Sequence, residues 1–269
     1  NVLLWGFGNM NQFILRYVAE KGHNVVGVVG RHHIGKDPFA VVGYKDTHIA
    51  KNNKTKEVKI ISEQQAEKEL KSYDPKPEVC ILATRNTMKE IEPTLKVLAN
   101  NSINVISLAE ECFFPETTSP TICKSLDTLF KEKGVSFTGT GVQDILYGIG
   151  PGAAIGAQHT INKIYGLAQY NIDGYGKYIC QALGVGMTVD QFNKANDSSS
   201  YGYFESNINS NEYLASMFGW KVKETKRKLT PVVVDKDIYS NSFNGNIKAG
   251  TVSGKNNHVI TECENGIII

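Results

Sequence analysis

The chain has 269 residues, 41% of them hydrophobic and 21% charged, which allows one large or two ordinary domains with packed cores and argues against a disordered protein. Its net charge of +2 is low for a nucleic-acid-binding protein, and no apolar run is long enough to span a bilayer, so neither nucleic acid nor a membrane is an expected partner. The five cysteines are scattered without zinc-site spacing, which favours reduced thiols in a cytoplasmic protein and no metal site.

The beginning of the chain is predicted to form a strand, a glycine turn and a helix. Apolar residues 2–5 lead into Gly6-Phe-Gly8-Asn-Met-Asn11. The helical pattern that follows places four apolar side chains on one face: Phe13, Ile14, Tyr17 and Val18. This order allows a dinucleotide pyrophosphate to bind backbone N–H groups at a helix N-terminus. Gly6 supplies the turn and Gly8 lets the backbone approach the phosphates, whereas Asn11 replaces the third glycine of the fingerprint and weakens the match.

The second predicted strand, residues 24–29, ends at the position that selects between the nicotinamide cofactors. An acidic side chain there would accept hydrogen bonds from the adenosine ribose and favour NAD. This chain has Arg31, His32 and His33 instead, and a guanidinium pairs well with a 2′-phosphate. We therefore expect NADP, with NAD as the alternative. The competing interpretation is that these three side chains lie on a solvated loop.

Strand and helix patterns continue to alternate after this position. A surface loop between short elements is expected over residues 37–57, and helices over residues 63–70 and 88–100. The further strands are predicted at residues 58–61, 78–84, 105–108 and 135–138. This alternation predicts an α/β fold in which residues 1–140 form a Rossmann domain with a doubly wound parallel sheet.

Polar residues follow two of these strands at their carboxyl ends, where such sheets bind ligands. Thr84 and Arg85 are expected to contact the cofactor, and Asn86 either does the same or caps the next helix. Of the adjacent Glu110 and Glu111, one is expected to face the crevice and the other the solvent. The competing interpretation of Glu110 is a surface carboxylate or a helix cap. The predicted cofactor-binding residues are Gly6, Phe7, Gly8, Asn9, Met10, Arg31, His32, His33, Thr84, Arg85, Asn86 and Ala109.

The sequence changes character at residue 141. Residues 148–157 are rich in small side chains, which predicts a helix approached closely by another backbone, and residues 159–173 alternate like a long strand. Further helices are expected at residues 190–195 and 205–217, and further strands at residues 222–234 and 246–269. Residues 141–269 are therefore predicted to form a second, α+β domain with a mixed or antiparallel sheet.

Five motifs together resemble one known family. In chain order, GFGNMN, ATRNT, ISLAEECFFP, GTGVQD and QYNIDGYG are similar to segments of 2,4-diaminopentanoate dehydrogenases and the related native amine dehydrogenases. The resemblance implies a dihydrodipicolinate-reductase-like architecture. It also implies NAD(P)H-dependent reductive amination of a ketone or aldehyde by ammonia, and the reverse oxidative deamination of a primary amine. The second domain would bind the substrate and form a homodimer through its sheet.

The resemblance also implies roles for particular residues. Glu110 would contact the reacting amine, with Glu111 as the less favoured choice, and a carboxylate there could accept a proton and stabilise an iminium cation. The implied substrate-binding residues are Gln143, Tyr147, Asn171 and Tyr175. Family members commonly have Asn-Pro where this chain has Gln143 and Asp144, which favours simpler amines over a diamino acid. The chain begins without Met and lacks the family's usual last segment, so residues are expected to be missing at its ends.

Two other functions stay open at this point. A dihydrodipicolinate-reductase-like enzyme, acting on a cyclic imine or an enoyl acid, would need basic side chains for two carboxylates, and the sequence has no Lys/Arg pair close to Gly141. A non-catalytic NADP-binding redox sensor would bind the cofactor without amine-dependent turnover. In such a sensor, the change Glu110→Gln would alter nothing.

Overall fold

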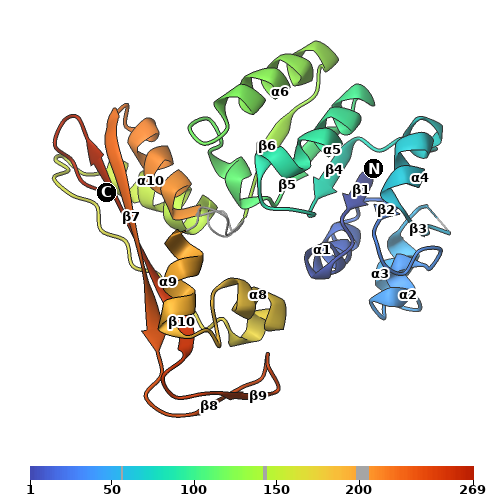
Figure 1. Cartoon of the computed structure of the whole chain (residues 1–269). Helices are drawn as coiled ribbons and strands as arrows, with labels where there is room; N and C mark the ends of the chain where they lie inside the picture. Colours follow the sequence, from blue (N-terminus) through green and yellow to red (C-terminus); the bar gives the residue numbers. More distant parts are fainter. Residues whose placement is uncertain (56, 142–143, 198–205) are drawn as a thin grey trace. The chain divides into compact units, whose positions relative to one another are not determined.

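The computed structural model describes residues 1–55, 57–141, 144–197 and 206–269, and it contains two compact units, Asn1–Ile145 and Leu146–Ile269 (Figure 1). The first unit contains every predicted cofactor-binding residue, and the second contains Tyr147, Asn171 and Tyr175. Within the described ranges, no helix combines the length and the apolar character that a membrane span requires.

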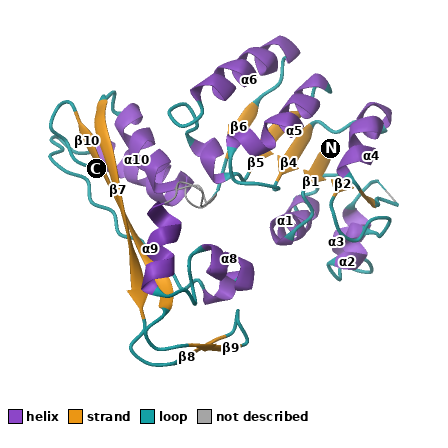
Figure 2. Cartoon of the chain, in the orientation of Figure 1, coloured by secondary structure: helices purple, strands orange, loops and turns teal. Residues whose placement is uncertain are grey.

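A six-stranded parallel sheet forms the centre of the first unit (Figure 2). Its strands, in chain order, are β1 (Val2–Trp5), β2 (Val25–Val29), β3 (Ile60–Ile61), β4 (Val79–Leu82), β5 (Asn104–Ser107) and β6 (Phe137–Gly139). They stand side by side in the order β3-β2-β1-β4-β5-β6. The order changes direction at β1, and sheets of this kind bind ligands at the carboxyl ends of the strands beside that point. The doubly wound parallel sheet predicted from the sequence is confirmed.

Helices cover both faces of this sheet (Figure 1). One layer consists of α1 (Asn9–Glu20), α2 (Pro38–Val41) and α3 (His48–Asn52), and the other of α4 (Glu63–Glu69), α5 (Met88–Asn100) and α6 (Pro120–Lys133). β1 contributes to both cores because successive side chains of a strand point to opposite faces. Leu3 and Trp5 pack with α4, α5 and α6, whereas Val2 and Leu4 pack with the other layer.

The buried face of α1 differs from the predicted one. Phe13 and Tyr17 are 68% and 57% exposed. The residues that α1 buries are Asn11, Leu15, Val18 and Ala19. The prediction was confirmed for Val18 and for Ile14, which packs against the core. It was wrong for Phe13 and Tyr17, because the buried stripe includes a polar side chain, Asn11, which hydrophobic periodicity does not count.

The expected surface loop over residues 37–57 contains two packed helices, α2 and α3. Asp37 begins α2, since its carboxylate accepts a hydrogen bond from the N–H of Phe39 at 2.8 Å. The side chains of Phe39 in α2 and Ile49 in α3 are buried in the core. After α3, the Asn53 side chain accepts from the N–H of Val25 at 2.7 Å and donates to its carbonyl at 3.0 Å. The loop prediction was wrong here because these few apolar and capping residues are enough to fix two short helices.

The second unit is built on a long antiparallel ribbon of β7 (Val222–Val233) and β10 (Val252–Cys263), with a short hairpin of β8 (Ile238–Ser240) and β9 (Gly245–Ile247) between them. The helices of this unit are α7 (Gly150–Gly156), α8 (Lys177–Ala182), α9 (Val189–Asp197) and α10 (Ser206–Met217). Leu214 and Ala215 of α10 share a core cluster with Cys263 and Ile269. The predicted α+β class with antiparallel strands is confirmed.

Two predictions for the second unit were wrong. Residues 159–173 form no strand, because alternation builds a strand only where a neighbouring strand pairs with it, and here the pairing is a single bridge between Lys163 and Ile268. In α7, Gly152 is approached by side chains and not by a backbone. A Cβ on Gly152 would lie 2.4 Å from the sulfur of Met217 and 3.6 Å from Leu214.

Candidate active site

The turn between β1 and α1 leaves open space beside its backbone. Gly6 has a φ of +92°, a conformation that favours glycine. A Cβ on Gly8 would meet nothing within 4 Å, so this position faces a space that a ligand can enter. No side chain of the described residues caps α1, and Asn9 and Met10 are exposed in its first turn. The N–H groups of Gly6, Phe7 and Gly8 donate to carbonyls of the protein itself, so it is the backbone N–H groups of the first turn of α1 that can receive an anionic group.

Two other residues of the turn hold the fold together. Phe7 is 6% exposed, so its side chain belongs to the core. Asn11 is fully buried, and its Nδ2 donates to the carbonyls of Trp5 (3.1 Å), Gly6 (3.2 Å) and Ile81 (3.2 Å). The amide thus fastens α1 to β1 and β4 at the position where the dinucleotide fingerprint has its third glycine. This role of the amide explains why Asn11 stands in place of the third glycine of the fingerprint. It does not affect the side of the turn that faces the open space at Gly8.

Arg31, His32 and His33 lie exposed on the loop that follows β2. His33 has a φ of +61°, and its carbonyl accepts a hydrogen bond from the N–H of Lys36 at 3.0 Å, which turns the loop back towards β3. Arg85, on the loop that follows β4, is also exposed. All four side chains are accessible to a ligand, and their contacts with a cofactor stay predictions.

The end of β4 lies directly against the glycine turn. A Cβ on Gly6 would approach the Cγ2 of Thr84 to 2.7 Å. The carbonyl of Asn86 accepts a hydrogen bond from the N–H of Glu111 at 3.1 Å, so this loop also contacts the segment that follows β5. The N-cap residue of α5 is Thr87, so the alternative that Asn86 caps this helix was wrong, and its contact with a cofactor stays a prediction.

The two adjacent glutamates lie on η2 (Glu110–Phe113), a short 3-10 helix. Glu111 is 4% exposed, and its Oε2 accepts a hydrogen bond from the N–H of Met88 at 2.6 Å. Its Oε1 accepts from the hydroxyls of Thr118 (2.7 Å) and Ser119 (2.6 Å). Since Met88 begins α5 and Ser119 precedes α6, the Glu111 carboxylate joins η2 to the starts of two helices. The expectation that one of the two glutamates faces the solvent does not hold for Glu111, which is a buried structural acid.

Glu110 lies at the same edge of the sheet as the glycine turn. β1, β4 and β5 are parallel neighbours, so their carboxyl ends meet at one edge. The N–H of Leu108 donates to the carbonyl of Leu82 at 3.0 Å, which keeps the chain beside β4 as it leaves β5. Ala109 is 3% exposed, and Glu110 is partly buried with its Oε2 shielded from water. Of the two glutamates, Glu110 is therefore the candidate for chemistry.

A buried acid that the sequence did not single out follows β6. Asp144 is 7% exposed, and its Oδ2 has no hydrogen-bond partner among the described residues. Burial raises the pKa of Asp144 to about 6. Burial also raises the pKa of Cys112 to about 12, and the charge of Asp144 contributes to that increase, so the acid lies within electrostatic reach of η2. Only its place after a strand was visible in the sequence, and its burial was not.

The change Asp144→Asn is expected to stabilise the protein at neutral pH. Because the folded-state pKa of about 6 lies above the ordinary 3.8, the folded protein holds this proton more tightly than the unfolded chain, and stability falls as the pH rises from about 4 to about 6. The loss is at most about 3 kcal/mol, since one pKa unit corresponds to about 1.4 kcal/mol. Thermal unfolding measured between about pH 4 and 7 should show the stability of the variant rise relative to that of the wild type as the pH increases. Parallel profiles would contradict the assignment.

Tyr147 and Tyr175 are neighbours in the second unit. Tyr147 belongs to η3 (Asp144–Ile149), a π-helical segment, and Tyr175 ends η4 (Asp173–Tyr175). Burial and then the proximity of Tyr175 raise the pKa of Tyr147. The rings of Tyr170 and Tyr175 meet edge to face, with centroids 6.5 Å apart. Three tyrosine side chains therefore gather at one place in this unit.

Asn171 shapes the turn that leads into η4. Its Oδ1 accepts a hydrogen bond from the N–H of Asp173 at 2.9 Å. The Asp173 carboxylate in turn accepts from the hydroxyl of Ser240 (2.5 Å) and the N–H of Asn241 (2.9 Å), which fastens η4 to the β8–β9 hairpin. Gln143, the remaining residue expected to bind substrate, lies outside the described residues.

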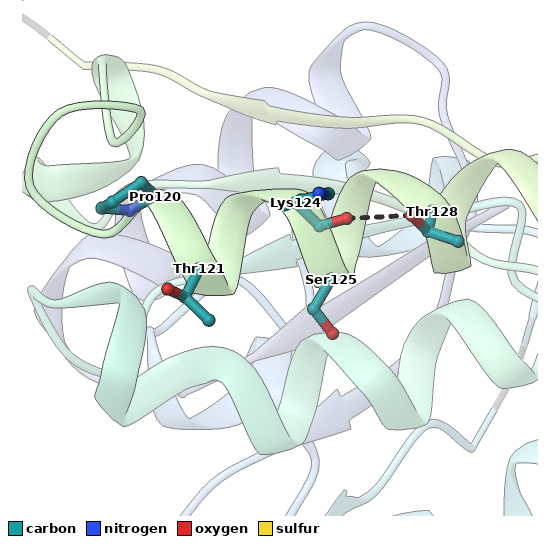
Figure 3. Close-up of a pocket in the computed structure, with 5 residues that line it drawn as sticks. All are labelled: Pro120, Thr121, Lys124, Ser125 and Thr128. Atoms are coloured by element: carbon teal, nitrogen blue, oxygen red, sulfur yellow. Dashed lines mark hydrogen bonds between the residues drawn. The ribbon is translucent and has the colours of Figure 1, made fainter.

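An open hollow along α6 is lined by Pro120, Thr121, Lys124, Ser125 and Thr128 (Figure 3). All of these residues belong to one helix, and the Thr128 hydroxyl donates to the carbonyl of Lys124 at 3.0 Å within that helix. None of them is a predicted site residue, and Lys124 is the one charged group in the lining. In the ranges that the structure describes, no group of three His, Cys, Asp or Glu side chains could hold a metal ion.

Comparison with known proteins supports the resemblance to one family. Residues 153–269 match the family model of the 2,4-diaminopentanoate dehydrogenase C-terminal domain. The 2,4-diaminopentanoate dehydrogenase of Acetoanaerobium sticklandii is 28% identical to this chain over 261 residues, which cover 94% of this chain and 69% of that protein. The chain is related to the 2,4-diaminopentanoate dehydrogenases. The resemblance predicted from the five motifs is confirmed.

Solved structures share the fold of this diaminopentanoate dehydrogenase relative. The amine dehydrogenase from Mycobacterium smegmatis has a TM-score of 0.84 and 24% identity, and the match covers 99% of this chain and 76% of that chain. A dehydrogenase from Thermus thermophilus, in complex with NAD and alpha-ketoglutarate, has a TM-score of 0.53 and 14% identity over 99% of this chain and 70% of that one. At these identities the likeness concerns the fold.

Proposed function

We propose that this relative of the 2,4-diaminopentanoate dehydrogenases is an NAD(P)-dependent amine dehydrogenase. It catalyses the reversible oxidative deamination of primary amines and the reductive amination of ketones and aldehydes with ammonia. The observation that carries this proposal is the partly buried carboxylate of Glu110 at the same sheet edge as the open glycine turn. The 2,4-diaminopentanoate dehydrogenase of A. sticklandii supports it as a relative.

A nicotinamide cofactor fits the residues around the glycine turn. The open space at Gly8 and the uncapped first turn of α1 suit a pyrophosphate. The loop after β2 is cationic and free of acidic residues up to Lys36, which favours NADP, with NAD as the alternative. The residues that would hold the cofactor are Gly6, Phe7, Gly8, Asn9, Met10, Arg31, His32, His33, Thr84, Arg85, Asn86 and Ala109; of these, Phe7 would act by shaping the turn, since its side chain is buried and its N–H donates to Val29.

Glu110 is assigned the proton transfers of the reaction. When bound, the nicotinamide supplies hydride transfer to or from the carbon that carries nitrogen. In deamination, the Glu110 carboxylate takes a proton from the substrate ammonium and leaves a neutral amine whose lone pair can form the C=N bond. In amination, the same carboxylate takes a proton from ammonium and frees ammonia as the nucleophile. The carboxyl group returns this proton to the hydroxyl of the carbinolamine, which leaves as water, and the restored negative charge stabilises the iminium cation.

The substrate-binding side chains are assigned to Gln143, Tyr147, Asn171 and Tyr175, of which the last three belong to the second unit. The neighbouring tyrosine rings favour a small amine with an apolar substituent. We further propose that residues 141–269 form the substrate-binding and dimerisation domain of a homodimer. A cytoplasmic location suits the five free thiols.

The change Arg31→Ser is expected to weaken NADP binding about 10- to 100-fold, because a hydrogen bond to a charged group contributes about 1.5–3 kcal/mol. NAD lacks the 2′-phosphate, so its dissociation constant should change less than about twofold. Direct titration of the protein with each cofactor checks this. Arg16→Ser is the matched control, since Arg16 is an exposed arginine on α1 that pairs with Glu20 at 2.7 Å. Equal losses for NADP and NAD would contradict the role of Arg31.

The reductive direction tests the proposed function. Purified protein is mixed with NADPH and a panel of small ketones and aldehydes, with and without ammonium. We expect NADPH consumption that needs both the carbonyl compound and ammonium, with the primary amine identified by mass spectrometry. Consumption with cyclic imines but without ammonium would identify an imine reductase. NADPH binding without consumption for any substrate would identify a sensor.

A further inference from the structure

Asp144 is a buried acid that the proton transfers of Glu110 do not use. Its side chain is 7% exposed, and its Oδ2 is shielded from water without a hydrogen-bond partner among the described residues. No Lys, Arg or His of the described chain forms an ion pair with it, and no cation contributes to its pKa. The one hydrogen bond that lowers the pKa of Asp144 comes from its own backbone N–H, so one carboxylate oxygen stays buried without a donor from the described part of the chain. Leaving this oxygen unpaired is costly, which points to a partner that a ligand supplies.

Asp144 follows the strand next to the one that leads to Glu110. β5 and β6 are parallel neighbours, with Ser107 opposite Gly139, and the N–H of Thr140 donates to the carbonyl of Ser107 at 2.9 Å. The end of β6 touches η2 closely, since a Cβ on Gly139 would lie 2.2 Å from the carbonyl oxygen of Cys112. The two carboxyl groups therefore belong to adjoining segments at the carboxyl edge of one sheet.

The chemistry of the missing partner follows from the charge of Asp144. With a pKa of about 6, the side chain is ionised at neutral and alkaline pH. An ionised carboxylate accepts hydrogen bonds and attracts a cation, and it donates nothing. A ligand that matches it must carry N–H donors and a positive charge. Ammonium and alkylammonium groups have both, and they are small enough to contact two carboxylates together.

We propose that Asp144 and Glu110 together form the binding site for the ammonium ion, or for the ammonium group of the amine. This inference rests on the proposed function and adds the residue that holds the nitrogen. Glu110 takes one proton from the bound ammonium, so that an N–H bond breaks, an O–H bond forms on the carboxyl group, and neutral ammonia remains. Asp144 stays ionised and keeps a second N–H oriented, so the lone pair that forms is held in one direction.

Steady-state reductive amination with Asp144→Asn tests the proposal. NADPH and the carbonyl substrate are kept saturating while ammonium is varied. We expect the KM for ammonium to rise about 10- to 100-fold, as loss of a charge-assisted hydrogen bond implies, while the KM values for NADPH and the carbonyl substrate stay within about twofold. Asp127→Asn is the control, because Asp127 is an exposed acid on α6 paired with Lys131. An unchanged KM for ammonium, or an increase confined to NADPH, would overturn the proposal.

A second measurement decides the proposal without turnover. Thermal unfolding of the NADP-bound protein is followed in ammonium chloride and in potassium chloride of equal ionic strength. We expect ammonium to stabilise the wild type more than potassium does, and this difference to vanish in Asp144→Asn. Equal stabilisation by both salts in the wild type would overturn the ammonium site even if the enzyme is active. If no carbonyl compound is aminated, the proposed function fails while this comparison still decides the site.

Discussion

Glu110→Gln is expected to lower amine-dependent turnover about 10²- to 10⁴-fold, the usual contribution of a group that transfers protons. The side chain keeps its size, lies partly exposed on η2, and loses only its charge and its ability to accept a proton. Stability should therefore change by less than about 1 kcal/mol. The measurement is kcat with the preferred amine, together with thermal unfolding of the same preparation.

Glu111→Gln is the matched control and is expected to show the opposite pattern. The Glu111 carboxylate accepts hydrogen bonds from the N–H of Met88 through one oxygen and from the hydroxyls of Thr118 and Ser119 through the other, and in glutamine one of these two positions becomes an NH₂ that cannot accept. Losing buried, charge-assisted bonds should cost about 2–4 kcal/mol. The variant should unfold at a lower temperature and keep most of its turnover where it is folded. If the Glu110→Gln variant kept full turnover, or if the Glu111→Gln variant were stable but inactive, Glu111 would be the residue that transfers protons.

Gly6→Ala is expected to cost about 3 kcal/mol or more in stability. The φ of +92° is unfavourable for alanine, and its Cβ would lie 2.3 Å from the carbonyl oxygen of Ala83, closer than any contact that can persist. The β1 turn and the end of β4 would have to separate. Thermal unfolding and denaturant titration measure the loss. A variant as stable as the wild type would show that this close approach does not hold the sheet edge together.

Gly8→Ala separates cofactor binding from folding. Gly8 has φ and ψ of −91° and −169°, extended values that alanine adopts readily, and its Cβ would meet nothing within 4 Å. Stability should change by less than about 1 kcal/mol. The new methyl group would occupy the space assigned to the pyrophosphate, so the NADP dissociation constant should rise at least about tenfold in a direct titration. Unchanged affinity would place the cofactor elsewhere.

Strong local patterns predicted much of the first unit. The helix expected over residues 88–100 is α5 with the same bounds, and the apolar run before Gly6 is β1. The face of α1 was not predictable in the same way, because its buried stripe at positions 11, 15, 18 and 19 includes Asn11. Residues 159–173 alternate as a strand does, but pairing depends on a neighbouring segment, which alternation does not reveal.

In the candidate site, too, local sequence patterns predicted some residues, and tertiary contacts were needed to identify the others. Position after parallel strands was enough to single out Thr84 and the pair Glu110 and Glu111, and the family resemblance favoured Glu110 of the two. Choosing between Glu110 and Glu111 needed the hydrogen bonds that Glu111 forms with residues as far along the chain as Ser119. Asp144 was not predicted as a site residue, because an acidic residue after a strand is expected to be exposed to solvent and its burial is known only from the structure.

Reduction of NADP by small primary amines tests the central claim most directly. Purified protein, NADP and a panel of amines are combined at alkaline pH, and the absorbance of reduced nicotinamide is followed. We expect an increase that depends on the amine and disappears in Glu110→Gln. NADP binding without an increase for any amine of the panel would contradict an amine dehydrogenase.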